Sequence, residues 1–224
     1  MTPPGGPRHL ADPVAQILAL RARRPQPRLV LGLAGLPGSG KSTLGRQLAE
    51  AVNARAGAPV MQTLGMDGFH LTRAALAQFP DPVQALRRRG APWTFDAAGL
   101  ARRIRQLRDA RRGAAAASVR WPGFEHGVGD PVEDAIEVPA ATDVVLIEGL
   151  YLLHRGDGWN LDGLLDACWY LDVDLATAME RLVARHRASW SLSLEQAQAR
   201  VDANDRLNAQ IVAATRSRAD ALLG

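Results

Sequence analysis

The sequence predicts a doubly wound α/β protein, in which helices cover both faces of a parallel sheet. Two observations support this prediction. Short apolar runs alternate with amphipathic stretches along the chain, and a glycine-rich turn joins the first of these runs to a helix. Strands that alternate with helices form parallel sheets with right-handed crossovers. At 224 residues the chain is expected to fold as one domain, residues 1–224.

The first part of the chain is predicted to begin with a helix and then to alternate strand and helix. Residues 10–24 place apolar side chains at helical spacing and are followed by two prolines, which end a helix. The apolar run 28–34 predicts a buried strand, and 41–55 predicts the helix that follows it. A second strand is expected over 59–66, directly before Asp67.

The middle of the chain combines one helix with an irregular stretch. Asp96 is expected to cap a helix that reaches about Arg112, because its side chain can accept a hydrogen bond from a free N–H group of the first turn. Residues 119–138 are expected to form an excursion of several turns. The run 143–148 predicts the clearest buried strand of the chain, and 167–173 predicts a fourth strand.

The C-terminal part is predicted to be helical almost to its end. A helix is expected over about 176–187, followed by a break. Ser193 and Gln196 then have the spacing of a capping box, for a helix that reaches about Ala213. Residues 218–223 can supply a last short strand.

Residues 35–43 read GLPGSGKST and match the phosphate-binding pattern G-x-x-x-x-G-K-[ST]. Glycines let backbone N–H groups surround phosphate oxygens, lysine supplies a compact charge, and the next hydroxyl can ligate Mg²⁺. Lys41 is the only lysine among 27 basic residues. The loop predicts that the chain binds a nucleoside triphosphate. The expected ATP-binding residues are Gly35, Pro37, Gly38, Ser39, Gly40, Lys41, Ser42 and Thr43.

Two acidic residues follow predicted strands, at the edge of the sheet where parallel α/β proteins bind their ligands. Asp67 could accept a proton from an attacking hydroxyl group or hold Mg²⁺ through water. Glu148 is expected near the metal, because burying an acid without a partner costs several kcal/mol. With Ser42, these two acids are the expected metal ligands. The sequence leaves open which acid is the base and which holds the metal.

Arginines on the predicted helix after the fourth strand are further candidates. Arg181 and Arg185 are four residues apart and therefore share a face of that helix. They could close over the transferring phosphate and stabilise its charge, or they could belong to a solvated helical face. The spacing alone favours neither interpretation.

The bulk composition is that of an ordinary soluble protein, with 47% hydrophobic and 22% charged residues. The net charge is only +4, and the arginines are spread along the chain, so a small anionic ligand explains the basic residues as well as nucleic acid does. No apolar run reaches the roughly 20 residues that cross a membrane. The N-terminus lacks an apolar signal core, which predicts a cytoplasmic protein.

Seven segments together resemble the phosphoribulokinase/uridine kinase family, which includes uridine kinases and bacterial pantothenate kinases. They read GLPGSGKST, MDGFHL, RRRGAPWTFD, WPGFEH, VVLIEGLYLL, RLVARH and ANDRLNA. The likeness is closest to bacterial nucleoside/nucleotide kinase-like proteins labelled putative fructose transport system kinases, and it spans about residue 29 to the C-terminus. The resemblance implies a P-loop NTPase fold with a five-stranded parallel sheet. It also implies an acceptor-side excursion at about 68–140 and a helical lid at about 181–200.

The same resemblance assigns expected roles to individual residues. Asp67 matches the candidate catalytic base, Glu148 matches the acid near the metal, and Arg181 and Arg185 match the start of the lid. With Lys41 these are the expected catalytic residues. The expected substrate-binding residues are Asp67, His70, Arg88, Phe95, Phe124 and Glu148.

The implied activity is an ATP- and Mg²⁺-dependent transfer of the γ-phosphate to a hydroxyl group of a small metabolite. After Asp67 the chain reads Gly-Phe-His, where uridine kinases have a bulkier, tyrosine-containing turn. A nucleoside, a sugar and a pantothenate-like acceptor therefore all remain open, and a homodimer would fit the family. The alternatives are a non-catalytic ATP-binding regulator and a nucleic-acid binder. A GTPase switch is not expected, because its N-K-x-D motif needs a second lysine.

Overall fold

The computed structural model describes residues 6–23, 28–110, 117–125 and 128–224. Within these residues the main sheet has six strands, all parallel, in the order β1-β8-β7-β2-β6-β3. The strands are β1 Arg8–His9, β2 Leu29–Gly35, β3 Met61–Gly65, β6 Val144–Gly149, β7 Ala167–Leu171 and β8 Ala221–Leu223. Each of the five predicted strands is present. The sixth, β1, is a two-residue edge strand, which is too short to leave an apolar run in the sequence.

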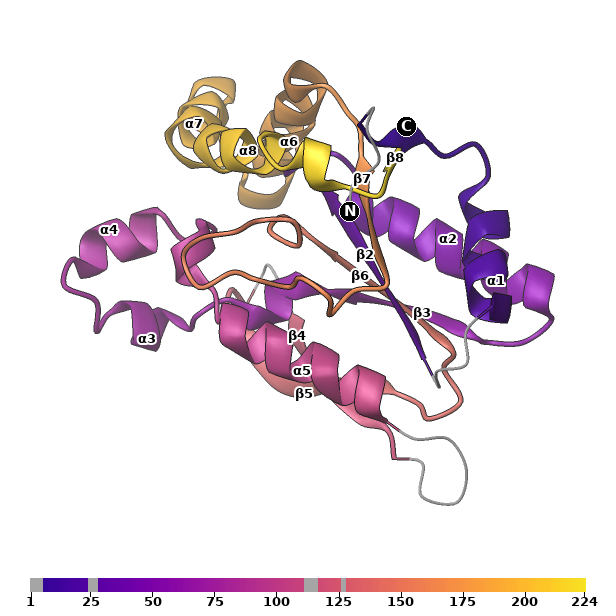
Figure 1. The fold of residues 1–224 in the computed structure, drawn as a ribbon. Helices are drawn as coiled ribbons and strands as arrows, with labels where there is room; N and C mark the ends of the chain where they lie inside the picture. The colour runs from indigo at the N-terminus through magenta and orange to yellow at the C-terminus, as the bar shows by residue number, and fades with distance from the viewer. Residues whose placement is uncertain (1–5, 24–27, 111–116, 126–127) are drawn as a thin grey trace.

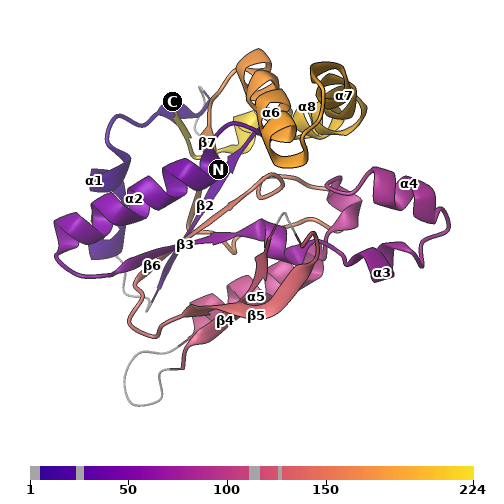
Figure 2. The ribbon, with the colours of Figure 1, turned by 180° about the vertical axis from the view of Figure 1, so that it is seen from behind.

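Helices cover both faces of this sheet, as Figures 1 and 2 show from opposite sides. Residues of β2 alternate between two hydrophobic cores, because successive side chains of a strand point to opposite faces. Leu31 and Leu33 pack with helices α1 (Pro13–Arg23) and α2 (Lys41–Ala56). Val30 packs in the other core, with the helices that cover the opposite face.

The second face is covered by α5 and by the C-terminal helices. Helix α5, Ala97–Asp109, begins at Asp96, whose side chain accepts a hydrogen bond from the Gly99 amide as predicted. Its predicted end at Arg112 lies outside the described residues. The remaining helices of this face are α6 Leu175–Trp190, α7 Leu194–Arg200 and α8 Arg206–Ala213.

The helix predicted from Ser193 to about Ala213 is present and contains a π-helical segment. The capping box between Ser193 and Gln196 is present, with hydrogen bonds of 3.1 and 2.9 Å. A π-turn, Val201–Asp205, then separates α7 from α8. Such turns add one residue to the helical repeat and are frequent at functional sites.

The prediction that residues 119–138 are irregular is wrong. They contain an antiparallel pair, β4 (Val119–Phe124) and β5 (Pro131–Val138). Pro122 and Gly123 lie inside β4 where the register shifts, and residues of this type normally argue against a strand. The buried indole of Trp121 anchors the pair to β3, because its N–H donates to the Gly65 carbonyl at 2.9 Å.

The segment between β3 and α5 contains only short elements. They are the 3₁₀ turn η1 Met66–Phe69, α3 Arg73–Leu76, α4 Pro82–Arg87 and the 3₁₀ turn η2 Pro92–Thr94. In Figure 1, α3 and α4 lie at the left and β4 and β5 at the lower centre, while the C-terminal helices lie at the top. Among the described residues no helix is both long and apolar enough to span a membrane.

Gly68 should be essential for the contact between η1 and β4. A Cβ at this position would lie 2.1 Å from the Pro122 carbonyl oxygen, so Gly68→Ala must displace backbone. We expect the free energy of unfolding in urea to fall by about 1–3 kcal/mol. Gly65→Ala is the matched control, because its Cβ would make an ordinary 3.5 Å contact. Equal stability of the two variants would contradict the packing described.

Candidate phosphate-transfer site

The phosphate loop connects β2 to α2 and uses its glycines for two different purposes. Gly40, the N-cap of α2, has φ +95° and open space around it, so it serves the left-handed turn alone. Gly38 also has positive φ, and a Cβ there would come 2.3 Å from the carbonyl oxygen of Ala178 in α6. The loop is therefore packed directly against the first helix of the predicted lid.

The side chains of the loop fit a phosphate ligand. The Ser39 hydroxyl is buried and has no hydrogen-bond partner within the described part of the chain. Native proteins rarely leave a buried polar group unsatisfied, so the hydroxyl is a ready donor for a ligand oxygen. The N-terminus of α2 directly follows it, and helix N-termini favour anions.

Lys41 is buried at the centre of the site. Its Nζ donates to the Leu36 carbonyl at 2.7 Å. Burial lowers the pKa of Lys41 to about 8, since the charged form loses its hydration. The charges of Glu148 and Asp67 oppose this effect, and the charge of Arg185 adds to it. Four predicted site residues therefore act on one another electrostatically.

Glu148 lies between the ends of two neighbouring strands. The register pairs it with Leu33 of β2 and with Gly65 of β3. Its Oε1 accepts a hydrogen bond from the Ser42 hydroxyl at 2.9 Å. Burial raises the pKa of Glu148, the negative charge of Asp67 raises it further, and Lys41 lowers it. The Ser42 hydroxyl and the Glu148 carboxylate are therefore in direct contact.

Asp67 does not directly follow the strand, whereas the sequence analysis expected the strand to reach residue 66. Strand β3 ends at Gly65, and Asp67 lies in the first turn of η1. The turn is held by the side chain of His70, whose Nδ1 donates to the Asp67 carbonyl at 2.8 Å. The negative charge of the Asp67 carboxylate still raises the pKa of both Lys41 and Glu148. The short turn thus carries Asp67 over the end of the strand toward the phosphate loop.

Aromatic residues predicted for the acceptor side are brought together around His70. The ring centroid of His70 lies 4.0 Å from that of Phe95 and 4.6 Å from that of Phe124. Phe124 belongs to β4, so the strand pair missed by the sequence analysis delivers this wall of the site. The Arg89 guanidinium lies over the Phe124 ring, 5.8 Å from its centroid.

Arg88 contacts residues that the sequence analysis did not select. Its guanidinium donates to the side chains of Asn204 and Asn208, at 2.7 and 3.1 Å. Tyr151 was missed as well: its buried hydroxyl donates to the Gly90 carbonyl at 2.6 Å. Burial raises the pKa of Tyr151, the positive charge of Arg88 lowers it, and the negative charge of Asp67 raises it further. The segment ANDRLNA, which contains both asparagines, was the available signal.

The two lid arginines are exposed but close to the loop. Nη1 of Arg181 donates to the carbonyl of Ser39 at 3.2 Å. Arg185, one turn later on α6, lowers the pKa of Lys41 because the two positive charges repel each other. Both therefore lie on the phosphate side of the site rather than on the acceptor side.

The described residues hold no group of three or more His, Cys, Asp or Glu side chains that could bind a metal by themselves. Mg²⁺ is commonly held by one or two carboxylates together with substrate phosphates and water. Ser42 and Glu148, already joined by a hydrogen bond, are the side chains that fit such an ion.

Comparisons with known proteins place the chain in one family. Residues 30–223 match the Phosphoribulokinase / Uridine kinase family. A fission yeast protein named "Putative uridine kinase C227.14" is 38% identical over 199 residues, covering 87% of this chain and 82% of that protein.

Two solved structures share the fold. The putative fructose transport system kinase from Silicibacter is 35% identical and has a TM-score of 0.81, with 96% of this chain and 100% of that chain covered. YFH7 from Saccharomyces cerevisiae, a putative P-loop kinase, is 22% identical with a TM-score of 0.79, covering 94% of this chain and 95% of that chain. The second likeness concerns the fold alone. The predicted P-loop kinase fold is confirmed, with six parallel strands among the described residues instead of five.

The low pKa of Lys41 makes a prediction about stability. An unfolded lysine, with a pKa near 10.5, keeps its proton between pH 8 and 10.5, whereas folded Lys41 releases it. The free energy of unfolding should therefore rise with pH across this window, by about 3 kcal/mol relative to Lys41→Met. Below pH 8 both states are protonated and the difference should be flat. Urea unfolding of both proteins from pH 7 to 10.5 measures it.

Removing the opposing charge should move this window. Glu148 favours the charged form of Lys41, so Glu148→Gln should lower the pKa of Lys41 further. In this background, the difference in unfolding free energy between Lys41 and Lys41→Met should begin to rise at a lower pH. A difference between the wild type and Lys41→Met that stays constant at every pH would contradict the burial of a titrating ammonium group.

Proposed function

Because this chain belongs to the phosphoribulokinase/uridine kinase family, we propose that it is an ATP- and Mg²⁺-dependent kinase acting on a hydroxyl group of a small metabolite. One observation carries the proposal. Lys41, Ser42, Glu148 and Asp67 come from three separate segments and converge at the carboxyl edge of β2, β6 and β3. Phosphoryl transfer depends on this kind of positioned charge more than on covalent chemistry.

The phosphate loop would hold ATP. Phosphate oxygens would bind its backbone N–H groups, from Gly35 to Thr43, and the Ser39 hydroxyl, which has no partner among the described residues. Lys41 would exchange its bond to the Leu36 carbonyl for the outer phosphates. The negative charge of the phosphates favours the ammonium form, so ATP should raise the pKa of Lys41 from about 8.

Ser42 and Glu148 would hold Mg²⁺, with Asp67 reaching it through water. The ion, when bound, would neutralise part of the charge on the phosphates. The hydrogen bond between Ser42 and Glu148 supports Glu148, rather than Asp67, as the acid of the metal site. Asp67 is then the acid left to act on the acceptor.

Asp67 would orient the acceptor hydroxyl and take its proton as phosphate is transferred. Its place in η1 supports this role, because the turn runs between the phosphate loop and the aromatic wall of His70, Phe95 and Phe124. The hydrogen bond from His70 Nδ1 to the Asp67 carbonyl would keep the turn in place.

The lid helix would complete the site from the phosphate side. Arg181 already bonds the Ser39 carbonyl, and Arg185 acts on Lys41. Guanidinium groups at these positions could stabilise the charge that spreads over the transferring phosphate, while closure excludes water. We propose that the reaction takes place in the cytoplasm.

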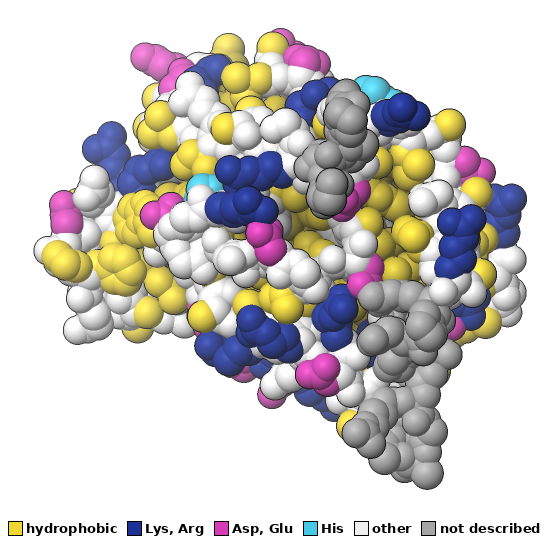
Figure 3. All heavy atoms as spheres, in the orientation of Figure 1, with side chains coloured by type: hydrophobic (Ala, Val, Ile, Leu, Met, Phe, Trp, Pro, Cys, Tyr) yellow, Lys and Arg dark blue, Asp and Glu magenta, His cyan; other side chains and the backbone are white. Residues whose placement is uncertain are grey.

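The acceptor belongs to the class of small hydroxylated metabolites. Names of relatives mention uridine and fructose, and these names describe those proteins. On the face drawn in Figure 3, basic and acidic side chains are interspersed. This distribution supports a small ligand bound in the interior more than a nucleic acid lying on that face.

Asp67→Asn should abolish phosphate transfer while it spares ATP binding. The amide keeps the size of the side chain but cannot accept the proton, so kcat should fall by at least about 100-fold. Release of ADP from Mg·ATP in the presence of pooled metabolites measures transfer, with Lys41→Ala as the blank. Titration calorimetry with ATP measures binding.

Glu148→Gln is the matched control for this variant. It should raise the Mg²⁺ concentration needed for half-maximal activity, whereas Asp67→Asn should not be rescued by any Mg²⁺ concentration. Full transfer by Asp67→Asn would refute the base assignment. ATP binding without transfer to any metabolite would instead favour a regulator, and salt-sensitive binding of RNA or DNA would favour a nucleic-acid binder.

A further inference from the structure

Arg88 has an unusual set of partners for a guanidinium group inside a site. Its Nη1 donates to the side chain and the carbonyl of Asn204, at 2.7 and 3.3 Å, and reaches the Ala203 carbonyl at 3.5 Å. Its Nη2 donates to the side chain of Asn208 at 3.1 Å. All of these partners are neutral oxygens. They fix the direction of the guanidinium without compensating its charge.

Two candidate carboxylates, Asp130 and Asp205, are engaged by other side chains. Within the described residues Arg88 forms no ion pair, whereas its neighbour Arg89 bonds Asp130 at 2.7 Å. Asp205 lies in the same π-turn as Asn204, but it bonds Nε2 of His186 at 2.7 Å. The half-buried charge of Arg88 therefore remains available to a ligand.

One edge of the guanidinium is open. No described residue accepts a hydrogen bond from Nε of Arg88, and this atom is not sealed from solvent. Nη2 also keeps a second hydrogen after its bond to Asn208. Elsewhere in the chain the same Nε and Nη2 atoms bind a carboxylate, as in the bonds from Arg216 to Asp172 at 2.7 and 2.6 Å. Paired N–H groups of this kind match carboxylate and phosphate oxygens.

The surroundings fix Arg88 beside the acceptor space. Gly90, two residues later, accepts the Tyr151 hydroxyl, and Tyr151 follows Glu148 by three residues. The ring of Tyr151 also meets Phe95 of the aromatic wall, with centroids 5.6 Å apart. Arg88 therefore lies near the part of the site formed by Tyr151 and Phe95.

Contacts between two distant segments hold this position. Asn204 of the π-turn and Asn208 of α8 bind the same guanidinium, and the Asn204 amide donates back to the Arg89 carbonyl at 3.1 Å. Gly90 has φ +104°, and a Cβ there would lie 3.5 Å from the Asn208 amide. These hydrogen bonds therefore join the segment 88–90 to Asn204 and Asn208 before any ligand binds.

We propose that Arg88, oriented by Asn204 and Asn208, binds an anionic group of the phosphate acceptor, either a carboxylate or a phosphate. This inference rests on the proposed kinase function and narrows its substrate to a hydroxylated metabolite with a negative charge. The asparagines are positioning residues, and Arg88 is the residue that touches the substrate.

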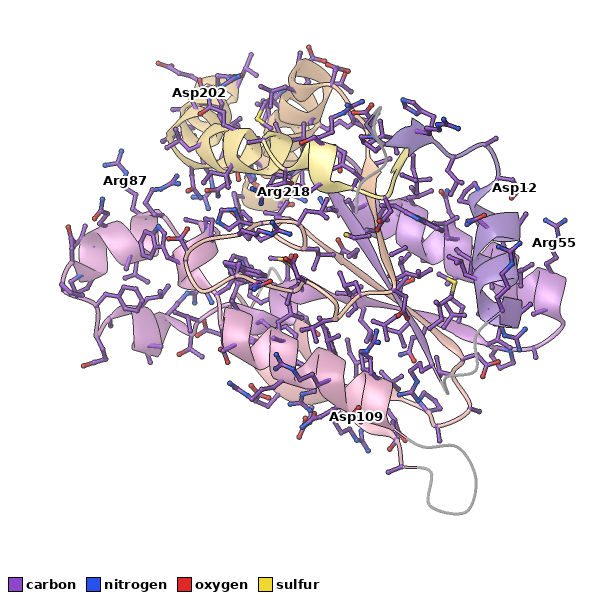
Figure 4. The ribbon with its side chains drawn as sticks, in the orientation of Figure 1. Asp12, Arg55, Arg87, Asp109, Asp202 and Arg218 are labelled. Atoms are coloured by element: carbon purple, nitrogen blue, oxygen red, sulfur yellow. The ribbon has the colours of Figure 1, made fainter. Side chains whose placement is uncertain are left out.

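Three variants separate recognition from structure. Arg88→Gln removes the charge. Asn208→Asp keeps the oxygen that holds Arg88 but supplies the missing negative charge. Arg87→Gln is the matched control, because Arg87 is the exposed neighbour that points away from the body of the protein in Figure 4.

The first measurement uses inorganic phosphate as the probe, in protein saturated with Mg²⁺ and a non-hydrolysable ATP analogue so that the phosphate loop is filled. Phosphate should raise the melting temperature of the wild type and of Arg87→Gln. In Arg88→Gln and Asn208→Asp its affinity should be about 10- to 100-fold weaker. Asn208→Asp itself should melt no lower than the wild type, because it adds an ion pair.

A structural role for Arg88 would give the opposite pattern. Asn208→Asp would then bind phosphate as the wild type does, and Arg88→Gln would melt at a lower temperature with unchanged phosphate affinity. Either result would overturn the proposal.

The second measurement follows ADP release with three pools: hydroxy acids, sugar phosphates, and neutral nucleosides and sugars. Release with either of the first two, and a KM for that acceptor raised at least about tenfold in Arg88→Gln with the ATP affinity unchanged, would support the proposal. The pool that responds identifies carboxylate or phosphate. Release with neutral compounds alone would refute the anionic acceptor and leave the kinase intact. Release with no pool would refute the kinase, and the phosphate titration would still decide whether Arg88 binds an anion.

Discussion

The buried ammonium group of Lys41 is the constraint on which the rest of the site depends. A lysine out of water is costly unless negative charge lies close by, and Glu148 and Asp67 supply that charge. Neither acid is near Lys41 in the sequence. The parallel order of β2, β6 and β3 brings them together, because all three strands end at the same edge. The negative charge of Asp67 in turn disfavours ionised Glu148, so a bound cation would relieve a repulsion that the protein holds in advance.

The C-terminal helices join the two halves of this arrangement. At one end, α6 packs against the phosphate loop where Gly38 leaves room for Ala178, and Arg181 bonds the loop at Ser39. At the other end, Asn204 of the π-turn and Asn208 of α8 bind Arg88. One helical unit thus contacts both the phosphate loop and Arg88. A displacement of these helices would change both sides together, which is the coupling that a kinase needs to avoid transfer to water.

The sequence predicts those features that depend on residues close together in the chain. The phosphate loop, the buried strands and the capping box at Ser193 depend on residues close together in the chain, and all are present. The strand pair β4–β5 was missed because Pro122 and Gly123 are tolerated only through a register shift and the anchoring of Trp121 to β3. The π-turn and the partners of Arg88 also depend on contacts between distant segments. Such contacts leave no period in the sequence, so only a family motif could have pointed to them.

The most direct test of the account is the affinity for ATP with and without Mg²⁺, measured by titration calorimetry on the wild type and on Lys41→Ala. If the buried ammonium and its acids form a nucleotide site, the wild type should bind ATP more tightly with Mg²⁺ than without it. Loss of the ammonium should weaken binding by more than about tenfold. Equal affinities in the two proteins, or binding that is indifferent to Mg²⁺, would contradict the claim that Lys41, Ser42 and Glu148 together hold the nucleotide and its metal.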